Sequence, residues 1–403
     1  MTTDTDLSGP ADTRVMGIVH TAMRRDIDRA GAVLAEWPYP FDEQRRALAD
    51  HLVWLMDFLH HHHESEDEHL YPVVRARNLA ARPLLDRMDA DHRSILPAMT
   101  ALSSAAAAYK HSADAREKLI AALDALRVLL FPHLEREENE MMPIVSDTLS
   151  DAEWRRWDNE YNVKPLGPIE LSDQGLFILD GLDGADRQAI TELVPALPRW
   201  IIVHLMIHRY RRQAFRRWRT REFSSLKTSL GGRQEVMTSA APRAVWDILT
   251  DVTRVGEWSH ECRRARWLDG ATSASVGARF TGDSRSGVMR WSRVCTITVL
   301  RAPRELAWTT HGGIYGDHTE WRYTLEPTGS GTRIVQTYRV LAMPIWFDRL
   351  VWLSTPAHHD RRTALHGDLT RLARLTEAAS SGPGSDRVSR GAQRVRDVGI
   401  RGD

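Results

Sequence analysis

Two segments of the chain carry the same potential metal ligands at the same spacing. In each, a glutamate follows a histidine by four residues and a proline follows the glutamate by six: His62, Glu66 and Pro72, then His133, Glu137 and Pro143. Residues four apart lie above one another on one face of an α-helix. Each segment can therefore offer an imidazole and a carboxylate to a single metal ion.

Two further histidines complete the pattern. His20 and His92 are 72 residues apart, and the two histidine–glutamate segments are 71 residues apart. Duplication of a pair of helices explains both offsets, and a pseudo-two-fold axis would bring the duplicated residues together in a bundle core. Burial of an uncompensated carboxylate is strongly unfavourable, and a metal ion compensates it. We therefore predict a dinuclear site with bridging carboxylates, formed by His20, His62, Glu66, His92, His133 and Glu137.

The elements that position these residues are predicted to be helices. Apolar residues recur every three or four positions from residue 13 to residue 150. Short breaks predict four helices, at 13–36, 42–78, 83–110 and 114–149. The periodicity continues past the prolines inside these segments, which predicts kinks at Pro72, Pro97, Pro132 and Pro143. The predicted fold of this half is an all-α, up-down-up-down four-helix bundle.

Residues 13–150 resemble the hemerythrin-like, or HHE cation-binding, domains. The resemblance is carried by four motifs: His20 with Met23 and Arg24, His62 to Pro72, Asp91 to Arg93, and His133 to Pro143. It implies a non-haem di-iron centre in which the two glutamates bridge and the four histidines cap the irons. Such a centre leaves a position for dioxygen, peroxide or nitric oxide. Manganese and zinc remain alternatives to iron, since mixed histidine and carboxylate ligation suits them as well.

One residue departs from the family pattern. Oxygen-carrying hemerythrins have a second histidine one turn after the ligand on the third helix, and here Leu96 occupies that position. The resemblance therefore implies sensing, peroxide chemistry or iron handling rather than reversible oxygen transport. An emptier coordination sphere also leaves room for an oxidase or a peroxidase.

The remaining histidines near this pattern are predicted to have other roles. Three of them, His60, His61 and His63, are expected to face mostly solvent. For His61 the alternative is a supporting role behind the metal ligands. His69 and Glu140 follow the ligands on the same helix faces. We predict a polar end of the bundle at this pair, with extra ligands or a proton path as alternatives.

Residues 151–228 are predicted to extend the bundle and then form a linker. The segment 209–221 contains seven arginines. It suits a phosphate or anionic membrane surface or, as we expect, a helix face against an acidic bundle. Residues 1–160 carry 29 acidic and 18 basic side chains, a net charge of −11. His204 and His208 have no partner helix with the same pattern, so we predict that they lie at the edge of the core.

From Gly231 the apolar pattern changes to a period of two residues, which predicts strands. The predicted strands are 233–239, 263–268, 277–282, 288–300, 305–311, 319–325 and 332–341, the last two forming a hairpin. A short helix begins at Pro242, and a long helix runs from Pro356 to Ala378. Residues 231–379 are therefore predicted to form an α+β domain.

This domain resembles the START-like SRPBCC superfamily, which includes polyketide cyclases, dehydrases and lipid-transport proteins. The resemblance is carried by residues 241–252, Glu257 with Trp258, residues 276–280, the late hairpin and the closing helix. It implies a helix-grip fold, in which a curved antiparallel sheet grips a long helix around a cavity for an apolar small molecule. Aromatic candidates for its lining, with core packing as the alternative, are Trp258, Trp291, Trp321 and Tyr323, together with Trp267 and Trp308.

The apolar segment 341–353 precedes the closing helix. It suits a cavity lid, a peripheral contact with a membrane, or an element packed inside the domain. No nucleophile motif and no pair of catalytic carboxylates stand out in this half. We therefore predict no catalytic residue there.

The composition excludes several classes of protein. Of 403 residues, 42% are apolar and 27% are charged, and no apolar run is long enough for a membrane-spanning helix. The net charge of zero argues against a nucleic-acid partner, and two cysteines are too few for a disulfide scaffold. The first residues lack a signal-peptide pattern, so we expect a cytoplasmic protein with disordered tails at 1–12 and 380–403.

Three functional hypotheses follow from these patterns. In the first, a di-iron bundle senses or handles dioxygen, peroxide, nitric oxide or iron, and the second domain binds an apolar small molecule. In the second, the centre is an oxidase or peroxidase and the second domain holds the substrate. In the third, the arginine-rich segment transmits the metal or redox state to another macromolecule.

Overall fold

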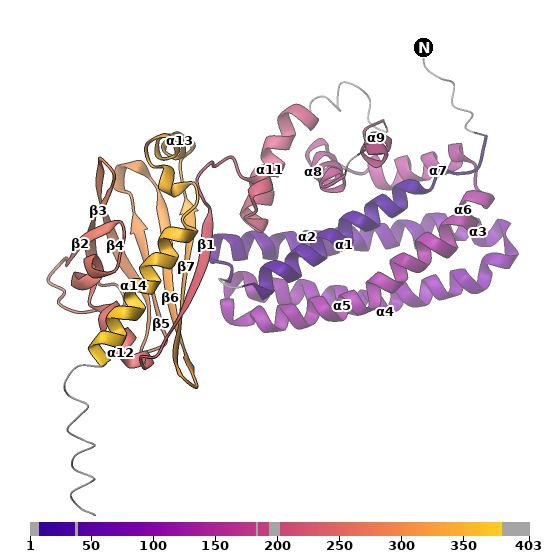
Figure 1. Ribbon diagram of the computed structural model, residues 1–403. Coiled ribbons are helices and arrows are strands. Elements are labelled where there is room, and N and C mark those ends of the chain that lie inside the picture. The colour runs from indigo at the N-terminus through magenta and orange to yellow at the C-terminus, as the bar shows by residue number, and fades with distance from the viewer. Residues whose placement is uncertain (1–7, 37–38, 183, 193–201, 381–403) are drawn as a thin grey trace, which may run out of the picture. The chain divides into compact units, whose positions relative to one another are not determined.

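The computed structural model describes residues 8–36, 39–182, 184–192 and 202–380. The chain divides into two compact units, Met1–Ser224 and Ser225–Asp403 (Figure 1). Residues 1–7 and 381–403 of the predicted tails lie outside the described residues. Within the first tail, Pro10 pairs with Ser150 and Ala11 is buried.

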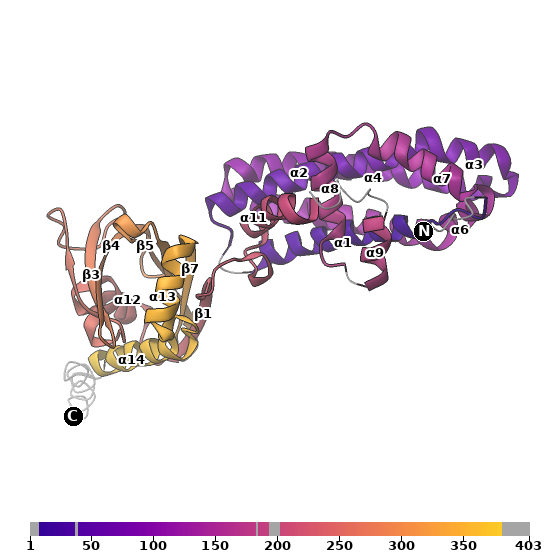
Figure 2. The same ribbon diagram turned by 90° about the horizontal axis from the view of Figure 1, so that it is seen from above.

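Four long helices form the first unit. They are α1 (Arg14–Ala35), α2 (Asp42–Ser65), α4 (Arg82–His111) and α5 (Arg116–Arg136), with short turns at η2 (Leu79–Ala81) and η3 (Ala113–Ala115). The long helices run beside one another in both views (Figures 1 and 2). Their apolar stripes meet in a core where Leu52, Leu102 and Leu126 are fully buried. The predicted four-helix bundle is confirmed.

Each predicted ligand glutamate begins a π-helical turn. These turns are η1 (Glu66–Leu70), which leads into α3 (Tyr71–Arg77), and η4 (Glu137–Met141), which leads into α6 (Met142–Thr148). Pro72 and Pro143 lie in the first turns of α3 and α6, where the missing N–H is best tolerated. The irregularity expected at these prolines is therefore a π turn, a feature frequent at functional sites. Pro97 and Pro132 lie inside α4 and α5.

Shorter helical segments continue the first unit. They are α7 (Asp151–Asp158), η5 (Asn159–Val163), α8 (Pro168–Leu179), α9 (Gly184–Glu192), η6 (Ile202–Met206), α11 (Ile207–Trp218) and η7 (Arg221–Phe223). α11 packs against α2, and Tyr210 and Trp218 join the bundle core. The prediction that His204 and His208 lie at the core edge is wrong, because both are exposed.

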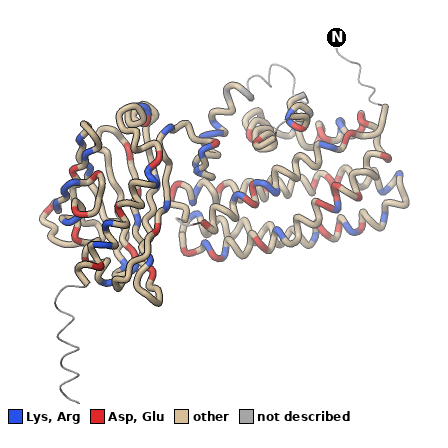
Figure 3. Tube along the Cα trace, in the orientation of Figure 1, with Lys and Arg blue, Asp and Glu red and all other residues tan. Residues whose placement is uncertain are grey.

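The arginine-rich segment occupies α11 and the residues after it, as the basic residues in Figure 3 show. Several of its arginines contact other helices of the same unit: Arg209 pairs with Asp173, Arg216 pairs with Glu43, and Arg217 donates to His51. These contacts agree with the expected helix face against the bundle.

Seven antiparallel strands form one sheet in the second unit. They are β1 (Gly231–Thr238), β2 (Cys262–Trp267), β3 (Arg279–Ser286), β4 (Met289–Arg301), β5 (Glu305–His311), β6 (His318–Thr328) and β7 (Gly331–Ala342). Their order is β1-β7-β6-β5-β4-β3-β2, so the first strand pairs with the last. The predicted hairpin is present, with Thr328 opposite Gly331 at its turn.

Helices complete the second unit as a helix-grip fold, which confirms the predicted fold class. They are α12 (Pro242–Thr250), η8 (Val252–Glu257), η9 (Gly313–Tyr315), α13 (Ile345–Ser354), η10 (Pro356–His358) and α14 (Arg362–Ser380). α14 crosses the sheet (Figures 1 and 2) and packs against β1 and α12. Leu369 and Leu372 are fully buried in a core that includes Tyr323 and Ile334. None of the described helices is both long and apolar enough to cross a bilayer.

The bundle core predicts a clear contrast between two residues of α5. Leu126 is fully buried, whereas Val128 is exposed. Replacing Leu126→Ala should lower the unfolding free energy by about 2–5 kcal/mol, because it removes buried apolar surface and leaves a cavity. Val128→Ala, the matched control, should change it by less than about 0.5 kcal/mol. Urea unfolding followed by helical circular dichroism measures both, and equal losses would contradict this packing.

Candidate functional site

The four predicted histidine ligands come together as two pairs in the interior of the bundle. His20 on α1 and His62 on α2 are buried, and their Nε2 atoms lie 3.1 Å apart. His92 on α4 and His133 on α5 are also buried, with their Nε2 atoms 3.2 Å apart. In each pair, two unprotonated imidazole nitrogens would face one common point.

The two predicted carboxylates lie between these histidine pairs. One oxygen of Glu66 is 3.2 Å from Nε2 of His62, and the other is 3.8 Å from Nε2 of His92. Oε2 of Glu137 is 3.5 Å from Nε2 of His20 and 3.7 Å from Nε2 of His133. Each carboxylate therefore reaches both pairs. This is the geometry that carboxylate bridging between two cations requires.

His63 is a further member of the cluster. The prediction that it faces solvent is wrong, because only 6% of it is exposed. Its ring stacks on that of His92, with centroids 4.0 Å apart. Two groups of three residues could each hold a metal ion: His20 with His62 and Glu137, and His63 with His92 and His133. Within each group, one nitrogen or oxygen atom of every residue lies within 4.8 Å of those of the other two.

Helix geometry explains how consecutive histidines serve two groups. Neighbouring residues of an α-helix point about 100° apart, so His62 faces α1 while His63 faces α4 and α5. The sequence does contain a signal for the role of His63. It precedes Glu66 by three residues, a spacing that places the two side chains on one helix face. Leu96, by contrast, is 47% exposed and points away from the cluster. The second group therefore has a third imidazole, but from α2 instead of α4.

The described residues do not satisfy all polar atoms of this cluster. Both carboxylate oxygens of Glu66, Oε2 of Glu137 and Nε2 of His63 are buried without a hydrogen-bond partner. Burial and the nearby Glu137 raise the pKa of Glu66 well above its usual value. Burial, followed by the neighbouring imidazoles, lowers the pKa of His62 and His63 well below theirs. Neutral imidazoles beside uncompensated carboxylates form a donor set that fits cations.

Outer carboxylates orient the histidines. A carboxylate oxygen lies near Nδ1 of three rings: Glu138 at 2.9 Å from His20, Asp67 at 2.8 Å from His92 and Asp91 at 3.5 Å from His133. Because a carboxylate only accepts, the hydrogen bonds of His20 and His92 place the proton of each neutral ring on Nδ1 and the lone pair on Nε2, toward the cluster. Nδ1 of His133 makes no hydrogen bond among the described residues. The sequence analysis missed these residues, although Asp67 and Glu138 directly follow the two central glutamates.

Tyr71 makes the two central glutamates different from each other. Its fully buried hydroxyl donates to Oε1 of Glu137 over 2.7 Å. Burial, and then the charges of Glu137 and Glu66, raise the pKa of Tyr71 well above its usual value. The hydroxyl therefore remains protonated and continues to donate. Glu66 has no such donor among the described residues.

The segment η5 covers one end of the cluster. His61 donates to the carbonyl oxygen of Tyr161 over 3.0 Å, and His69 stacks on the ring of Tyr161 with centroids 3.7 Å apart. His60 and Glu140 are exposed. His60, His61, His69 and Glu140 are not members of the two metal-holding groups found among the described residues. For His69 and Glu140, this agrees with the predicted polar end of the bundle.

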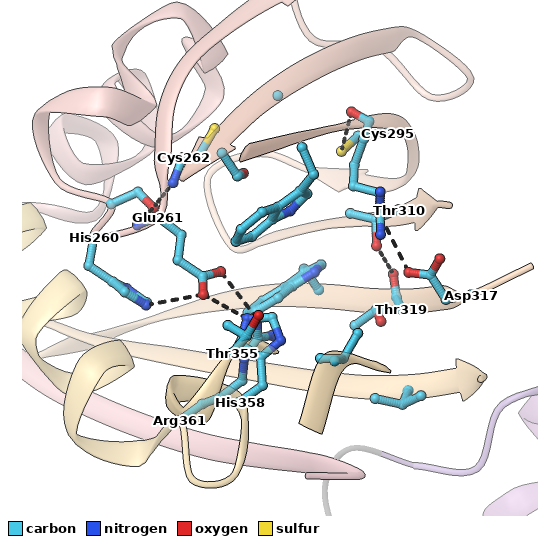
Figure 4. A pocket seen from close by; sticks show the side chains of 18 of the residues that line it. His260, Glu261, Cys262, Cys295, Thr310, Asp317, Thr319, Thr355, His358 and Arg361 are labelled. Carbon is cyan, nitrogen blue, oxygen red and sulfur yellow. Dashed lines mark hydrogen bonds and ion pairs between the residues drawn. The ribbon is translucent and has the colours of Figure 1, made fainter. Parts of the chain in front are cut away.

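A second candidate site is a cavity of about 320 Å³ in the C-terminal unit (Figure 4). Its walls include all four of the retained aromatic candidates, Trp258, Trp291, Trp321 and Tyr323, and also Trp308 and Phe280. Trp267 packs on Phe280 outside the lining. Phe347 and Val351 on α13 line the cavity, whereas Trp346 on the same helix is exposed. The apolar segment 341–353 thus closes one side of the cavity.

A polar network at one side of this cavity was missed by the sequence analysis. Glu261 accepts from Nε2 of His358 over 2.7 Å and from Arg361 over 3.1 Å. His260 contacts Asp368 with its Nδ1. These partners are about 100 residues apart in the chain, at separations of 97, 100 and 108. Local spacing therefore carries no signal for them.

Comparisons with known proteins match both units. Residues 12–145 match the hemerythrin HHE cation binding domain, and residues 232–377 match the polyketide cyclase / dehydrase and lipid transport family. A search of curated proteins finds no match.

Several solved structures are similar to this chain. A crystal structure of a protein from Mesorhizobium loti has 19% identity and a TM-score of 0.28, covering 37% of this chain and 97% of that chain. A crystal structure of a protein from Nitrosomonas europaea has 15% identity and a TM-score of 0.29, covering 38% and 97%. A solution structure of a polyketide-cyclase-like protein from Corynebacterium glutamicum has 25% identity and a TM-score of 0.29, covering 39% and 96%.

The cavity network predicts a pH-dependent stability. Burial opposes ionisation of Glu261, but the charge of Arg361 and the hydrogen bond from His358 outweigh it and lower the pKa of Glu261 from 4.5 to about 2. A lowered folded-state pKa stabilises the fold above the unfolded-state value, and this stabilisation is lost as the pH falls through the folded-state value. Glu261→Gln should therefore be less stable than the unchanged chain at pH 7.

The difference in unfolding free energy between Glu261→Gln and the unchanged chain should shrink as the pH falls from 4.5 toward 2. Denaturant unfolding at a series of pH values measures this difference. A difference that stays constant over the acid range would show that the ionised form of Glu261 contributes nothing to the fold.

Proposed function

Because the chain joins a hemerythrin HHE cation binding domain to a polyketide cyclase and dehydrase domain, we propose that it is a di-iron protein coupled to a ligand-binding domain. The bundle senses or handles dioxygen, peroxide, nitric oxide or iron, and the second domain binds an apolar small molecule. The proposed metal ligands are His20, His62, Glu66, His92, His133 and Glu137, together with His63.

One observation carries this proposal, the position of Glu66. Its carboxylate is fully buried, and neither oxygen has a hydrogen-bond partner among the described residues. The two oxygens lie near His62 and His92, which belong to different histidine pairs. Burial of a carboxylate in this state is costly unless a cation compensates it. Two cations, one on each side of the carboxylate, would satisfy both of its oxygens.

The unequal histidine sets support a place for a small exogenous ligand. The first group has two imidazoles, His20 and His62, whereas the second has three, His63, His92 and His133. If Glu66 and Glu137 are shared by both groups, the first group offers one protein donor fewer than the second. Iron at such a site supplies reversible one-electron chemistry and affinity for diatomic or peroxide ligands. The apolar cluster that includes Met16, Leu70 and Tyr71 lies beside this cluster of ligands.

The second unit supports the binding of an apolar small molecule. Its cavity volume of about 320 Å³ is at the lower end of the range for small-molecule sites. Buried aromatic side chains line it, including Trp258 and Tyr323, and a limited number of polar groups converge at its sides. Aromatic walls with a few oriented polar groups are typical of such sites.

The proposal predicts different effects for two histidines of α2 that are three residues apart. His63→Ala should lower the iron content of the purified chain to below two ions, because it removes a buried donor from the three-histidine group. His60→Ala, the matched control at an exposed position, should leave the iron content unchanged. Elemental analysis measures both variants. Equal iron content in the two would remove His63 from the ligand set.

Metal binding is also predicted to stabilise the bundle. A ligand that binds only the folded state raises its stability, so a chelator should lower the melting temperature of the unchanged chain. The double variant His62→Ala with Glu66→Ala should melt at the same temperature with and without chelator. Scanning calorimetry tests this, and identical melting of the unchanged chain in both conditions would contradict the site.

Gas binding and peroxide turnover separate the two functional classes. Spectral changes with dioxygen or nitric oxide, without consumption of peroxide, would support a sensor. Sustained peroxide consumption that is lost in the same double variant would instead place the centre among oxidases and peroxidases.

A further inference from the structure

The side chain of His260 is held by a buried carboxylate at the wall of the C-terminal cavity. Its Nδ1 is 2.8 Å from Oδ2 of Asp368, and its backbone N–H donates to Oδ1 of the same residue over 2.8 Å. Asp368 is buried and also accepts from Arg371. Because the carboxylate only accepts, the proton of the neutral ring belongs on Nδ1. The lone pair of the ring is therefore on Nε2.

This Nε2 is available to a ligand in the cavity. Among the described residues it makes no hydrogen bond, and Oε1 of Glu261, at 3.8 Å, is its ion-pair contact. Glu261 is already occupied by His358 and Arg361 (Figure 4). The His260 side chain is 27% exposed and lines the cavity. A half-buried histidine held by a buried carboxylate thus presents an unoccupied proton acceptor to the cavity.

The charges of the cavity favour a neutral ligand. Each carboxylate of its lining has a guanidinium partner: Glu261 with Arg361, Asp317 with Arg293, and Asp368 with Arg371. Arg290, the other arginine of the lining, is exposed. Since these charges neutralise one another, a charged ligand would be desolvated without a net countercharge from them, at a high cost. Oδ1 of Asp317 and Nε of Arg361 are buried without a hydrogen-bond partner among the described residues, and a neutral ligand with polar groups could satisfy them.

The walls favour a planar aromatic ligand. The rings of Trp308 and Tyr323 are nearly parallel, at 18°, with centroids 5.5 Å apart, and Trp258 meets Tyr323 edge to face at 5.9 Å. All three line the cavity, and aromatic rings pack favourably on one another in these two arrangements.

We propose that the C-terminal cavity has an acid–base activity, in which His260 removes a proton from a neutral, planar aromatic ligand and Asp368 is its positioning residue. A C–H or O–H bond of the ligand breaks, an N–H bond forms at Nε2, and the electron pair stays on the ligand. Asp368 stabilises the imidazolium that results. The proton then returns to the product or leaves to water. This activity goes beyond the proposed function, which requires only binding.

The ring opening of 5-nitrobenzisoxazole tests this step directly. The compound is neutral, planar and aromatic. When a base removes its ring C–H proton, the electron pair forms a nitrile, the N–O bond breaks, and a coloured phenolate is released. The full chain should open the ring with saturable kinetics. No oxidant, reductant or metal is needed, so the result does not depend on the di-iron proposal.

Replacing His260 should remove this activity. His260→Ala should lower kcat at least about 100-fold, the lower end of what a positioned base contributes, and added imidazole should restore part of the rate. His260→Gln keeps a donor for Asp368 and should be equally inactive while folding normally. Asp368→Asn should lower kcat with little change in KM. His366→Ala, at an exposed position of the same helix as Asp368, is the matched control and should be unaffected.

Three results would overturn the proposal. If His260→Gln and the unchanged chain open the ring equally fast, His260 is not the base. If imidazole fails to restore any rate to a folded His260→Ala chain, the loss is structural. If calorimetry detects no binding of 5-nitroindazole, a neutral isostere that cannot open, the assigned ligand class is wrong.

Discussion

The N-terminal half of the molecule depends on two carboxylates buried where none of the described residues neutralises them. Glu66 and Glu137 lie between histidines of different helices, and three of their four oxygens lack a hydrogen-bond partner. Such groups are tolerated only when a cation compensates them or when they remain protonated. The outer carboxylates that hold the rings by Nδ1 favour the first solution, because they direct the Nε2 lone pairs of His20 and His92 inward.

The two histidine–glutamate segments have the same spacing, as a duplicated helix pair would give, but their surroundings differ. Both central glutamates begin π turns, and each is followed by an acidic residue that holds a histidine of the other pair. Tyr71 contacts Glu137 only, and His63 joins one group only. These differences make the two histidine groups unequal. Under the proposed function, the group with fewer donors is the place for a small exogenous ligand.

Local periodicity explains what the sequence could predict. The bundle, the hairpin and the spacing of the six proposed ligands depend on helix and strand repeats, and these repeats are visible in one segment at a time. His63 was misjudged because its direction depends on how α4 and α5 pack against α2, which no single helix specifies. The pair of His260 and Asp368 joins residues 108 positions apart, so only the tertiary fold reveals it.

The central claim is that two cations occupy the two histidine groups joined by Glu66 and Glu137. Anomalous diffraction at the iron edge, from crystals of the full chain grown with iron, tests it most directly. The account predicts two iron peaks, one beside His20 and His62 and the other among His63, His92 and His133. A single peak, or iron bound outside these groups, would contradict it.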